Sequence, residues 1–162
     1  MFEPAQLQLA AAIIDRCRVR GLRIATAESC TGGLISGCLT AIAGSSAVFD
    51  RGFVTYSDAA KTALLGVTED LLAHSGAVAE AVARAMAEGA LRAAGTDLAI
   101  AVTGIAGPDG GTAEKPVGLV HFAAARVGAD TWHERHVFAG DRQAVRTATV
   151  TTALRLLAGR ID

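Results

Sequence analysis

LRIATAESCTGGLISGCLTA, residues 22–41, is the stretch from which the fold can be inferred. Leu22–Ala27 is a short apolar run of the kind that forms a buried strand. A tight turn ending in Gly32-Gly33 follows it, and a helical pattern then runs from Leu34 to about Ala41. A strand that leads through a glycine turn directly into a helix is typical of layered α/β proteins.

Helical and strand patterns alternate along the rest of the chain. We expect further helices at 6–20, after Ser57, and at 69–74, 79–94 and 142–157, and further strands at 48–56, 98–102, 117–126 and 131–138. The last two strands, joined by residues 127–130, favour an antiparallel hairpin. The sequence therefore predicts an α/β domain with a mixed sheet.

Charge and length restrict the class of protein. The 162 residues include 15 basic and 16 acidic side chains, for a formal net charge of −1, and no run of five or six like charges. A nucleic-acid surface normally needs a basic stripe, so we expect no nucleic-acid partner, although one phosphate needs only one or two arginines. The length fits a single domain, residues 1–162.

The cysteines and the hydropathy pattern indicate a cellular compartment. Three cysteines, an odd number without a Cys-x-x-Cys pair, fit a reducing environment better than a disulfide framework. The N-terminus lacks the basic-then-apolar layout of a signal peptide, and no apolar run is long enough to span a bilayer. We therefore expect a cytoplasmic protein that does not associate with membranes.

The turn at residues 28–33 places a hydroxyl and a thiol, those of Ser29 and Cys30, where a strand becomes a helix. The glycines let a substrate approach the backbone, and N–H groups at this point could stabilise an oxyanion or hold a phosphate. A nucleophile at this position, a hydroxyl or a thiol, would have those N–H groups beside it. The alternative is that Ser29 or Thr31 only caps the helix, because such caps are common.

Lys61 is the candidate base. It follows the strand end at Tyr56 and the helix start at Ser57-Asp58, and its sequence neighbours are mainly Ala, Leu and Gly rather than acidic partners. A lysine in an apolar setting can have a lowered pKa, and Ser-Lys pairs replace Ser-His-Asp in some hydrolases. The alternative is a solvated surface lysine.

A glycine-rich loop, residues 103–116, follows another predicted strand directly. Loops of this length inside a compact domain are usually functional or mobile, so this one could close over a substrate. The alternative is a flexible connection.

Metal and cofactor motifs are missing from the sequence. His133 and His136 do not have zincin spacing, and on a strand they would point to opposite faces. Neither a phosphate-binding Gly-x-x-x-x-Gly-Lys loop nor a dinucleotide fingerprint occurs. We expect neither a metal nor a cofactor. The missing dinucleotide fingerprint, together with the separation of five between Tyr56 and Lys61, also counts against an oxidoreductase that uses these two residues.

Several segments together resemble the C-terminal domain of the competence/damage-inducible CinA proteins, from about Leu7 to Leu157. Lys61 and Arg146 occupy the positions expected from the family, in the same order along the chain as the matching segments. The matching segments are AESCTGG (27–33), AGSS (43–46), RGFVTYS (51–57), GAV (76–78), TGIAGPDGG (103–111), KPVG (115–118) and GDR (140–142).

The resemblance implies a fold, an activity and a set of site residues. The fold would be a three-layer α/β/α domain with a mixed, mostly parallel sheet. The reaction would convert nicotinamide mononucleotide and water to nicotinate mononucleotide and ammonia, in pyridine nucleotide recycling by a homo-oligomer. Ser29 and Lys61 would carry the hydrolysis, and Tyr56 would be the third catalytic residue, sharing a hydrogen bond with one of them. The residues expected to line the substrate site are Thr31, Gly32, Gly33, Thr103, Gly104 and Arg142.

Two other functions remain open at this point. The first is a thiol amidase that uses Cys30, although Ser29 and Cys30 would point apart on an extended chain and only one could face the pocket. The second is a non-catalytic nucleotide-binding or competence accessory protein.

Overall fold

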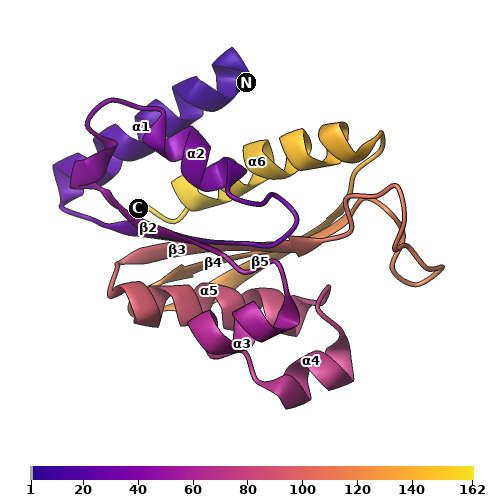
Figure 1. Cartoon of the computed structure of the whole chain (residues 1–162). Coiled ribbons are helices and arrows are strands. Elements are labelled where there is room, and N and C mark those ends of the chain that lie inside the picture. The colour runs from indigo at the N-terminus through magenta and orange to yellow at the C-terminus, as the bar shows by residue number, and fades with distance from the viewer. Residues whose placement is uncertain (1) are drawn as a thin grey trace.

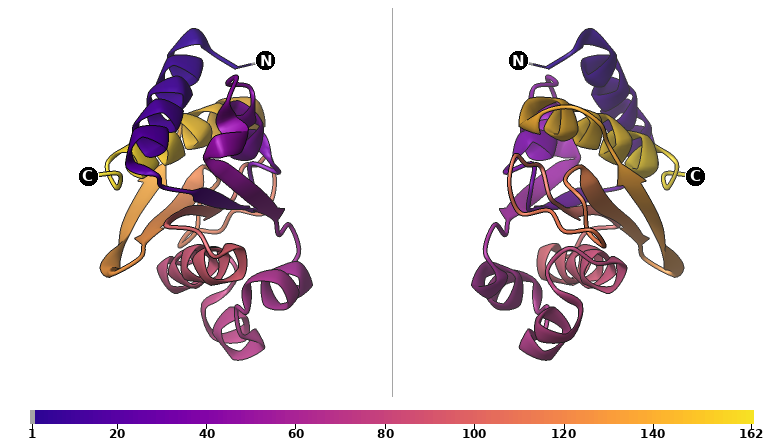
Figure 2. Two further views of the ribbon diagram at one scale, coloured as in Figure 1. Left: turned by 90° about the vertical axis from the view of Figure 1, so that its left-hand side faces the viewer. Right: turned by 90° about the vertical axis from the view of Figure 1, so that its right-hand side faces the viewer.

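The computed structural model describes residues 2–162 and contains a five-stranded sheet with helices on both faces (Figure 1). Helices α1, α2 and α6 cover one face, and α3, α4 and α5 cover the other, as the two side views show most clearly (Figure 2). The strands are β1 (Ile24–Glu28), β2 (Phe49–Val54), β3 (Leu98–Gly104), β4 (Leu119–Arg126) and β5 (Ala129–Val137). The helices are α1 (Pro4–Arg20), α2 (Leu34–Thr40), α3 (Asp58–Leu65), α4 (Glu69–Ser75), α5 (Glu80–Ala94) and α6 (Arg142–Ala158), with a 3-10 turn at Ser45–Ala47.

The sheet is mixed, in the order β2-β1-β3-β4-β5. β1 pairs in parallel with β2 and β3, whereas β4 pairs antiparallel with β3 and β5. The α/β class is therefore confirmed. The expectation of a mostly parallel sheet is wrong, because the hairpin of β4 and β5 makes half of the four pairings antiparallel.

The predicted hairpin is present, with a shorter connection than expected. Only Val127 and Gly128 form the turn, and Gly128 has a φ of 76°, a conformation that glycine adopts without strain. β5 consequently begins at Ala129 rather than at Thr131.

The two faces of the central strands pack differently. β1, β3 and β4 are buried almost throughout, as expected for strands covered on both sides. Large side chains such as Ile13, Ile24 and Leu98 fill the side of α1, α2 and α6. The α5 side uses mainly alanines, for example Ala99 and Ala123, so α5 can lie close to the sheet.

One glycine fixes the distance between α3 and α5. A Cβ on Gly89 in α5 would lie 2.1 Å from the carbonyl oxygen of Leu65, the last residue of α3. Any larger residue there would push α3 away from α5, and α3 carries Lys61.

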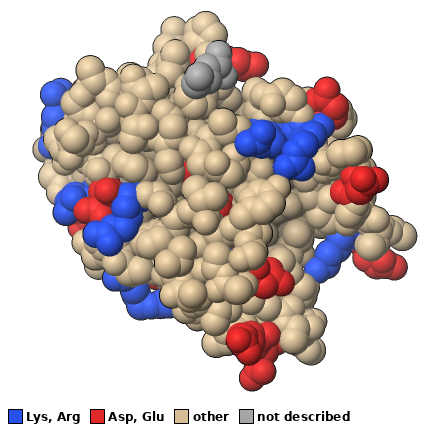
Figure 3. Space-filling view, in the orientation of Figure 1, with Lys and Arg blue, Asp and Glu red and all other residues tan. Residues whose placement is uncertain are grey.

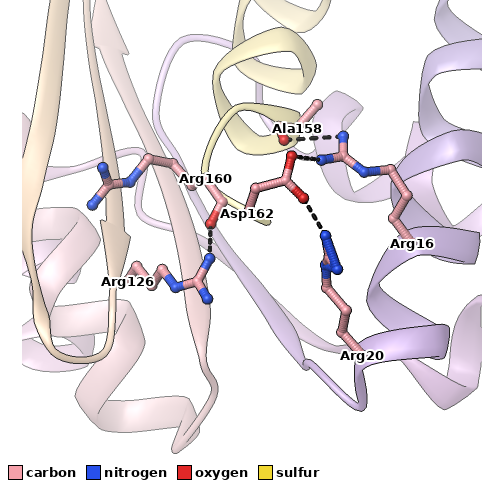
Figure 4. Close-up of polar contacts among 6 residues, drawn as sticks. All are labelled: Arg16, Arg20, Arg126, Ala158, Arg160 and Asp162. Atoms are coloured by element: carbon pink, nitrogen blue, oxygen red, sulfur yellow. Dashed lines mark hydrogen bonds and ion pairs between the residues drawn. The ribbon is translucent and has the colours of Figure 1, made fainter.

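The C-terminal end of the chain lies on the α1/α6 side and contacts the last turns of α1 through arginines (Figure 4). The Asp162 carboxylate accepts from Arg16 at 2.7 Å and also from Arg20, both on α1. Arg16 also donates to the Ala158 carbonyl at 3.2 Å, and Arg126 donates to the Arg160 carbonyl. These contacts tie the end of α6 to α1, although exposed ion pairs contribute little to the free energy of unfolding.

Charged side chains on the face drawn in Figure 3 form small separate groups between wide areas of other residues. Among the helices that residues 2–162 form, none is both long and apolar enough to cross a membrane.

Candidate active site

Three strand ends meet at one edge of the sheet and bring the predicted site residues together. Because β1, β2 and β3 are parallel, the segments that follow them emerge at the same edge. The Ser29 amide donates to the Val102 carbonyl of β3 at 3.1 Å, and the Thr55 amide donates to the Glu28 carbonyl at 2.9 Å. The first bond holds the segment after β1 beside β3, and the second holds the segment after β2 beside β1.

Ser29 and Lys61 form a buried pair within this edge. Lys61 Nζ lies 3.3 Å from Ser29 Oγ and 3.0 Å from the Thr55 carbonyl oxygen. The Lys61 side chain is only 1% exposed, so the alternative of a solvated surface lysine is wrong. The pair has the hydrogen-bonded geometry that a nucleophile and its base require.

Burial lowers the pKa of Lys61 below its ordinary value of 10.5, because desolvation penalises the ammonium. The carboxylate of Asp58, 3.7 Å from Nζ, opposes this shift by stabilising the charged form. The expectation that Lys61 has no acidic partner is therefore wrong. Asp58 lies one helical turn before Lys61, and both side chains lie on the same side of α3.

Glu28, rather than Ser29 or Thr31, caps helix α2. Its carboxylate is fully buried and accepts from the backbone amides in the first turn of the helix, while the cap residue Gly33 has no side chain to offer. The alternative in which Ser29 acts only as a cap is therefore wrong, and its hydroxyl faces Lys61 instead. The donors to Glu28 are the amides of Gly33, Ile35 and Ser36 and the hydroxyls of Thr26, Thr31 and Ser36.

In the 28–33 turn, most polar groups of the candidate substrate residues already have hydrogen-bond partners. The Thr31 hydroxyl donates to Glu28 at 2.7 Å, and the Gly33 amide donates to the same oxygen at 3.0 Å. The Gly32 amide donates to the Ser29 carbonyl. Gly32 and Gly33 have φ values of 60° and 99°, which explains why glycines occupy both positions.

Tyr56 and Arg142 contact each other at the rim of the site. Arg142, near the start of α6, donates from one terminal nitrogen to the Tyr56 hydroxyl and from the other to the Gly107 carbonyl, each at 2.9 Å. The expected hydrogen bond from Tyr56 to Ser29 or Lys61 is absent from the described contacts, because the tyrosine is 60% exposed and its hydroxyl lies against Arg142. Arg142 thus joins the end of β2 to the glycine-rich loop.

Thr103 and Gly104 lie at the end of β3, beside the Ser29 turn. The Thr103 hydroxyl donates to the Ala77 carbonyl at 2.8 Å, which ties β3 to the segment before α5. A Cβ on Gly104 would lie 2.7 Å from the Leu119 carbonyl oxygen, so a close strand contact explains this glycine. Among residues 2–162, the Thr103 side chain makes no hydrogen bond to Ser29 or Lys61, and Gly104 has no side chain.

Residues 6–161 match the family model of the CinA C-terminal domain. The chain belongs to the CinA C-terminal domain family. The nicotinamide-nucleotide amidohydrolase PncC of Escherichia coli K12 is 49% identical over 157 residues, which cover 97% of this chain and 95% of that protein. A CinA-like protein of Geobacter sulfurreducens is 57% identical over 145 residues, but this chain spans only about a third of its length, 35%. The crystal structure of the competence/damage inducible protein CihA from Agrobacterium tumefaciens superposes with a TM-score of 0.96 at 50% identity, covering 98% of this chain and 97% of that one.

Cys30 points away from the pair in this member of the CinA C-terminal domain family. It is 6% exposed and belongs to the core on the α1/α2/α6 side. Burial raises the pKa of its thiol to about 12, so the thiolate is disfavoured at neutral pH. The expectation that Ser29 and Cys30 point in different directions is confirmed.

Two polar groups of the site region were missed in the sequence. Glu28 was identified only as part of the family motif, because ordinary cap residues lie at the start of the helix itself and Glu28 reaches α2 only through the fold. The second is a chain of contacts on the α5 side, in which His121 Nδ1 lies 3.0 Å from His133 Nε2 and His133 Nδ1 lies 3.5 Å from Glu80. His136 lies against Phe122 and Phe138, so the prediction that His133 and His136 face opposite sides is confirmed.

Proposed function

We propose that the chain is an amidohydrolase that converts nicotinamide mononucleotide and water to nicotinate mononucleotide and ammonia. The observation that carries this proposal is the buried contact of 3.3 Å between Lys61 Nζ and Ser29 Oγ. It is supported by 49% sequence identity to a nicotinamide-nucleotide amidohydrolase over nearly the full length of both chains. We further propose a single cytoplasmic domain, residues 1–162, that acts in pyridine nucleotide recycling as a homo-oligomer.

The proposed acylation step uses Ser29 and Lys61 as one unit. Ser29 Oγ forms a bond to the carboxamide carbon while its proton passes to a neutral Lys61 Nζ. The carbon–nitrogen bond then breaks, Lys61 returns the proton to the nitrogen, and ammonia leaves. The lowered pKa of Lys61 supports this role, because a base must be neutral before it accepts a proton.

The proposed second step releases the product. Water attacks the ester formed with Ser29, Lys61 takes a proton from the water, and the same proton returns to Ser29 Oγ as nicotinate mononucleotide leaves. No group beyond this chain's own residues, the substrate and water enters either step.

We assign the oxyanion site to the amides of Cys30 and Thr31. In residues 2–162, neither amide donates a hydrogen bond to another residue, whereas the Gly32 and Gly33 amides have acceptors within the turn. Donors just after a nucleophile lie close to the carbonyl that it attacks, and one such donor typically contributes about 10²–10³ in kcat.

The remaining substrate contacts are proposed at the rim. The Arg142 guanidinium at the Tyr56 hydroxyl could hold the substrate phosphate, since arginine binds phosphate through paired N–H groups. Thr103 and Gly104 would form the wall beside the pyridine ring, with the 105–111 loop above it.

Release of ammonia by the pure protein tests the function directly. Nicotinamide mononucleotide, nicotinamide and a dinucleotide are compared side by side, with Ser29→Ala as the blank. We expect rapid release from the mononucleotide alone. Binding of the mononucleotide without ammonia release would favour a non-catalytic accessory protein, and activity that survives Ser29→Ala but not Cys30→Ala would favour a thiol amidase.

A further inference from the structure

Glu28 is a fully buried carboxylate at the residue before the proposed nucleophile. Both of its oxygens accept hydrogen bonds, six in all, from residues between 26 and 36. The shortest are from the hydroxyls of Thr31 and Ser36, both at 2.7 Å. A charge removed from water needs this degree of pairing to be tolerated.

Strand alternation separates Glu28 from the reacting atoms. The side chain of Glu28 lies on the α2 side of the sheet, where its partners are. Ser29, the next residue, presents its hydroxyl to Lys61 of α3, on the opposite side. Glu28 therefore acts on the reaction only through the backbone of the turn.

The carboxylate decides which amides of the turn remain free. It accepts from the amides of Gly33, Ile35 and Ser36. Because one side chain accepts from all three amides, it fixes the path of residues 29–33. The amides of Cys30 and Thr31 are left without an acceptor in another residue of the described chain. The cap and the proposed oxyanion site are thus two results of one arrangement.

We propose that Glu28 is a positioning residue for the hydrolysis, which holds the 29–33 turn so that Ser29 Oγ meets Lys61 while the Cys30 and Thr31 amides meet the oxyanion. This inference rests on the proposed function. On this inference, Glu28 contributes more to stabilising the tetrahedral intermediate than to binding the substrate or the product.

Glu28→Gln tests this contribution to catalysis at nearly constant side-chain size. A glutamine keeps one acceptor oxygen but turns an NH₂ group toward amide or hydroxyl donors, so the turn must shift. We expect kcat to fall about 10²-fold, as for loss of one oxyanion donor, with KM for nicotinamide mononucleotide within about threefold of the parent value. Ser36→Ala is the matched control, because it removes one hydroxyl donor and leaves the amide bonds intact; its kcat should stay within about threefold.

A second measurement separates positioning from a merely structural cap. The substrate analogue with an aldehyde in place of the carboxamide can add Ser29 and form an oxyanion-like hemiacetal, whereas nicotinate mononucleotide cannot. In Glu28→Gln, the inhibition constant of the aldehyde should rise by about the factor by which kcat falls, with the product dissociation constant nearly unchanged.

The outcomes are distinct. Equal weakening of aldehyde and product, or no change in kcat, would overturn the positioning role alone, and an unmodified protein that releases no ammonia would overturn the proposed function itself. If Glu28→Gln does not fold by circular dichroism, Glu28→Asp decides. That variant keeps the charge but withdraws it by one methylene, so kcat at least tenfold lower at unchanged KM supports the proposal, and kcat equal to that of the parent overturns it.

Discussion

Lys61 Nζ lies 3.3 Å from Ser29 Oγ although the two residues are 32 positions apart in the sequence. The contact forms because β1 and β2 are parallel neighbours, so the turn after β1 and the helix after β2 start at the same edge of the sheet. Gly89 allows α3 to pack at short distance against α5, and this packing keeps Lys61 beside Ser29. The fold itself thus buries a lysine beside a hydroxyl.

The pH dependence of kcat/KM should report on Lys61. The base must be neutral, so activity should rise with pH through a Lys61 pKa that burial has lowered below 10.5. Asp58 favours the ammonium, and Asp58→Asn should therefore move this rise to lower pH. Lys61→Arg should be inactive at every pH, since guanidinium remains protonated.

Initial rates of ammonia release at substrate concentrations well below KM, over a pH series, provide the measurement, with the exposed Asp70→Asn on α4 as the charge-matched control. A rise that moves to higher pH in Asp58→Asn would contradict the assignment of Lys61 as the base.

Adjacent substitutions should separate the serine and thiol mechanisms. Ser29→Ala should abolish ammonia release with little effect on folding, because it deletes a single oxygen. Cys30→Ala should keep substantial activity, since that thiol lies in the core with a pKa of about 12. The double variant Ser29→Ala/Lys61→Ala should be little worse than either single one, because the two act as one unit. An active Ser29→Ala beside a dead Cys30→Ala would replace the serine mechanism.

The sequence predicted the parts of the site that depend on local pattern. Strands ending at the Ser29 turn and before Lys61 follow from apolar runs and glycines, and parallel strands place their ends together. The resemblance named Ser29 and Lys61, but only the fold shows that they touch.

Contacts that depend on tertiary packing could not be predicted. The Glu28 cap requires that the chain turn back over its own strand end, and the Arg142 contact with Tyr56 joins residues 86 positions apart. The prediction of a mostly parallel sheet was wrong for a related reason. Hydropathy alone does not distinguish a buried antiparallel strand such as β4 from a parallel one.

Arg142 should determine affinity for the phosphate of the substrate. Arg142→Ala should raise KM for nicotinamide mononucleotide about tenfold or more, because a charge-assisted hydrogen bond to phosphate is lost. Slow hydrolysis of free nicotinamide, which has no phosphate, should be unaffected. Tyr56→Phe is the control, since it removes only the hydroxyl that Arg142 contacts. An unchanged KM in Arg142→Ala would place the phosphate elsewhere.

Stability should fall in mild acid because of His121. Burial, with a smaller effect of His133 and Arg135, lowers the pKa of His121 to about 4 from 6.5, against an opposing effect of Glu80. The folded state therefore holds fewer protons than the unfolded state between these values. The contribution of neutral His121 is complete above pH 6.5 and is lost progressively as the pH falls toward 4, by at most about 3 kcal/mol at about 1.4 kcal/mol per unit.

Urea unfolding between pH 4 and 7 measures this effect. His121→Gln should unfold with a flatter pH dependence than the parent, because it can still contact His133 but cannot take up a proton. His74→Gln, at an exposed histidine of α4, is the matched control and should keep the parent slope. If His121→Gln loses stability in acid as steeply as the parent, the assignment of this loss to His121 is wrong.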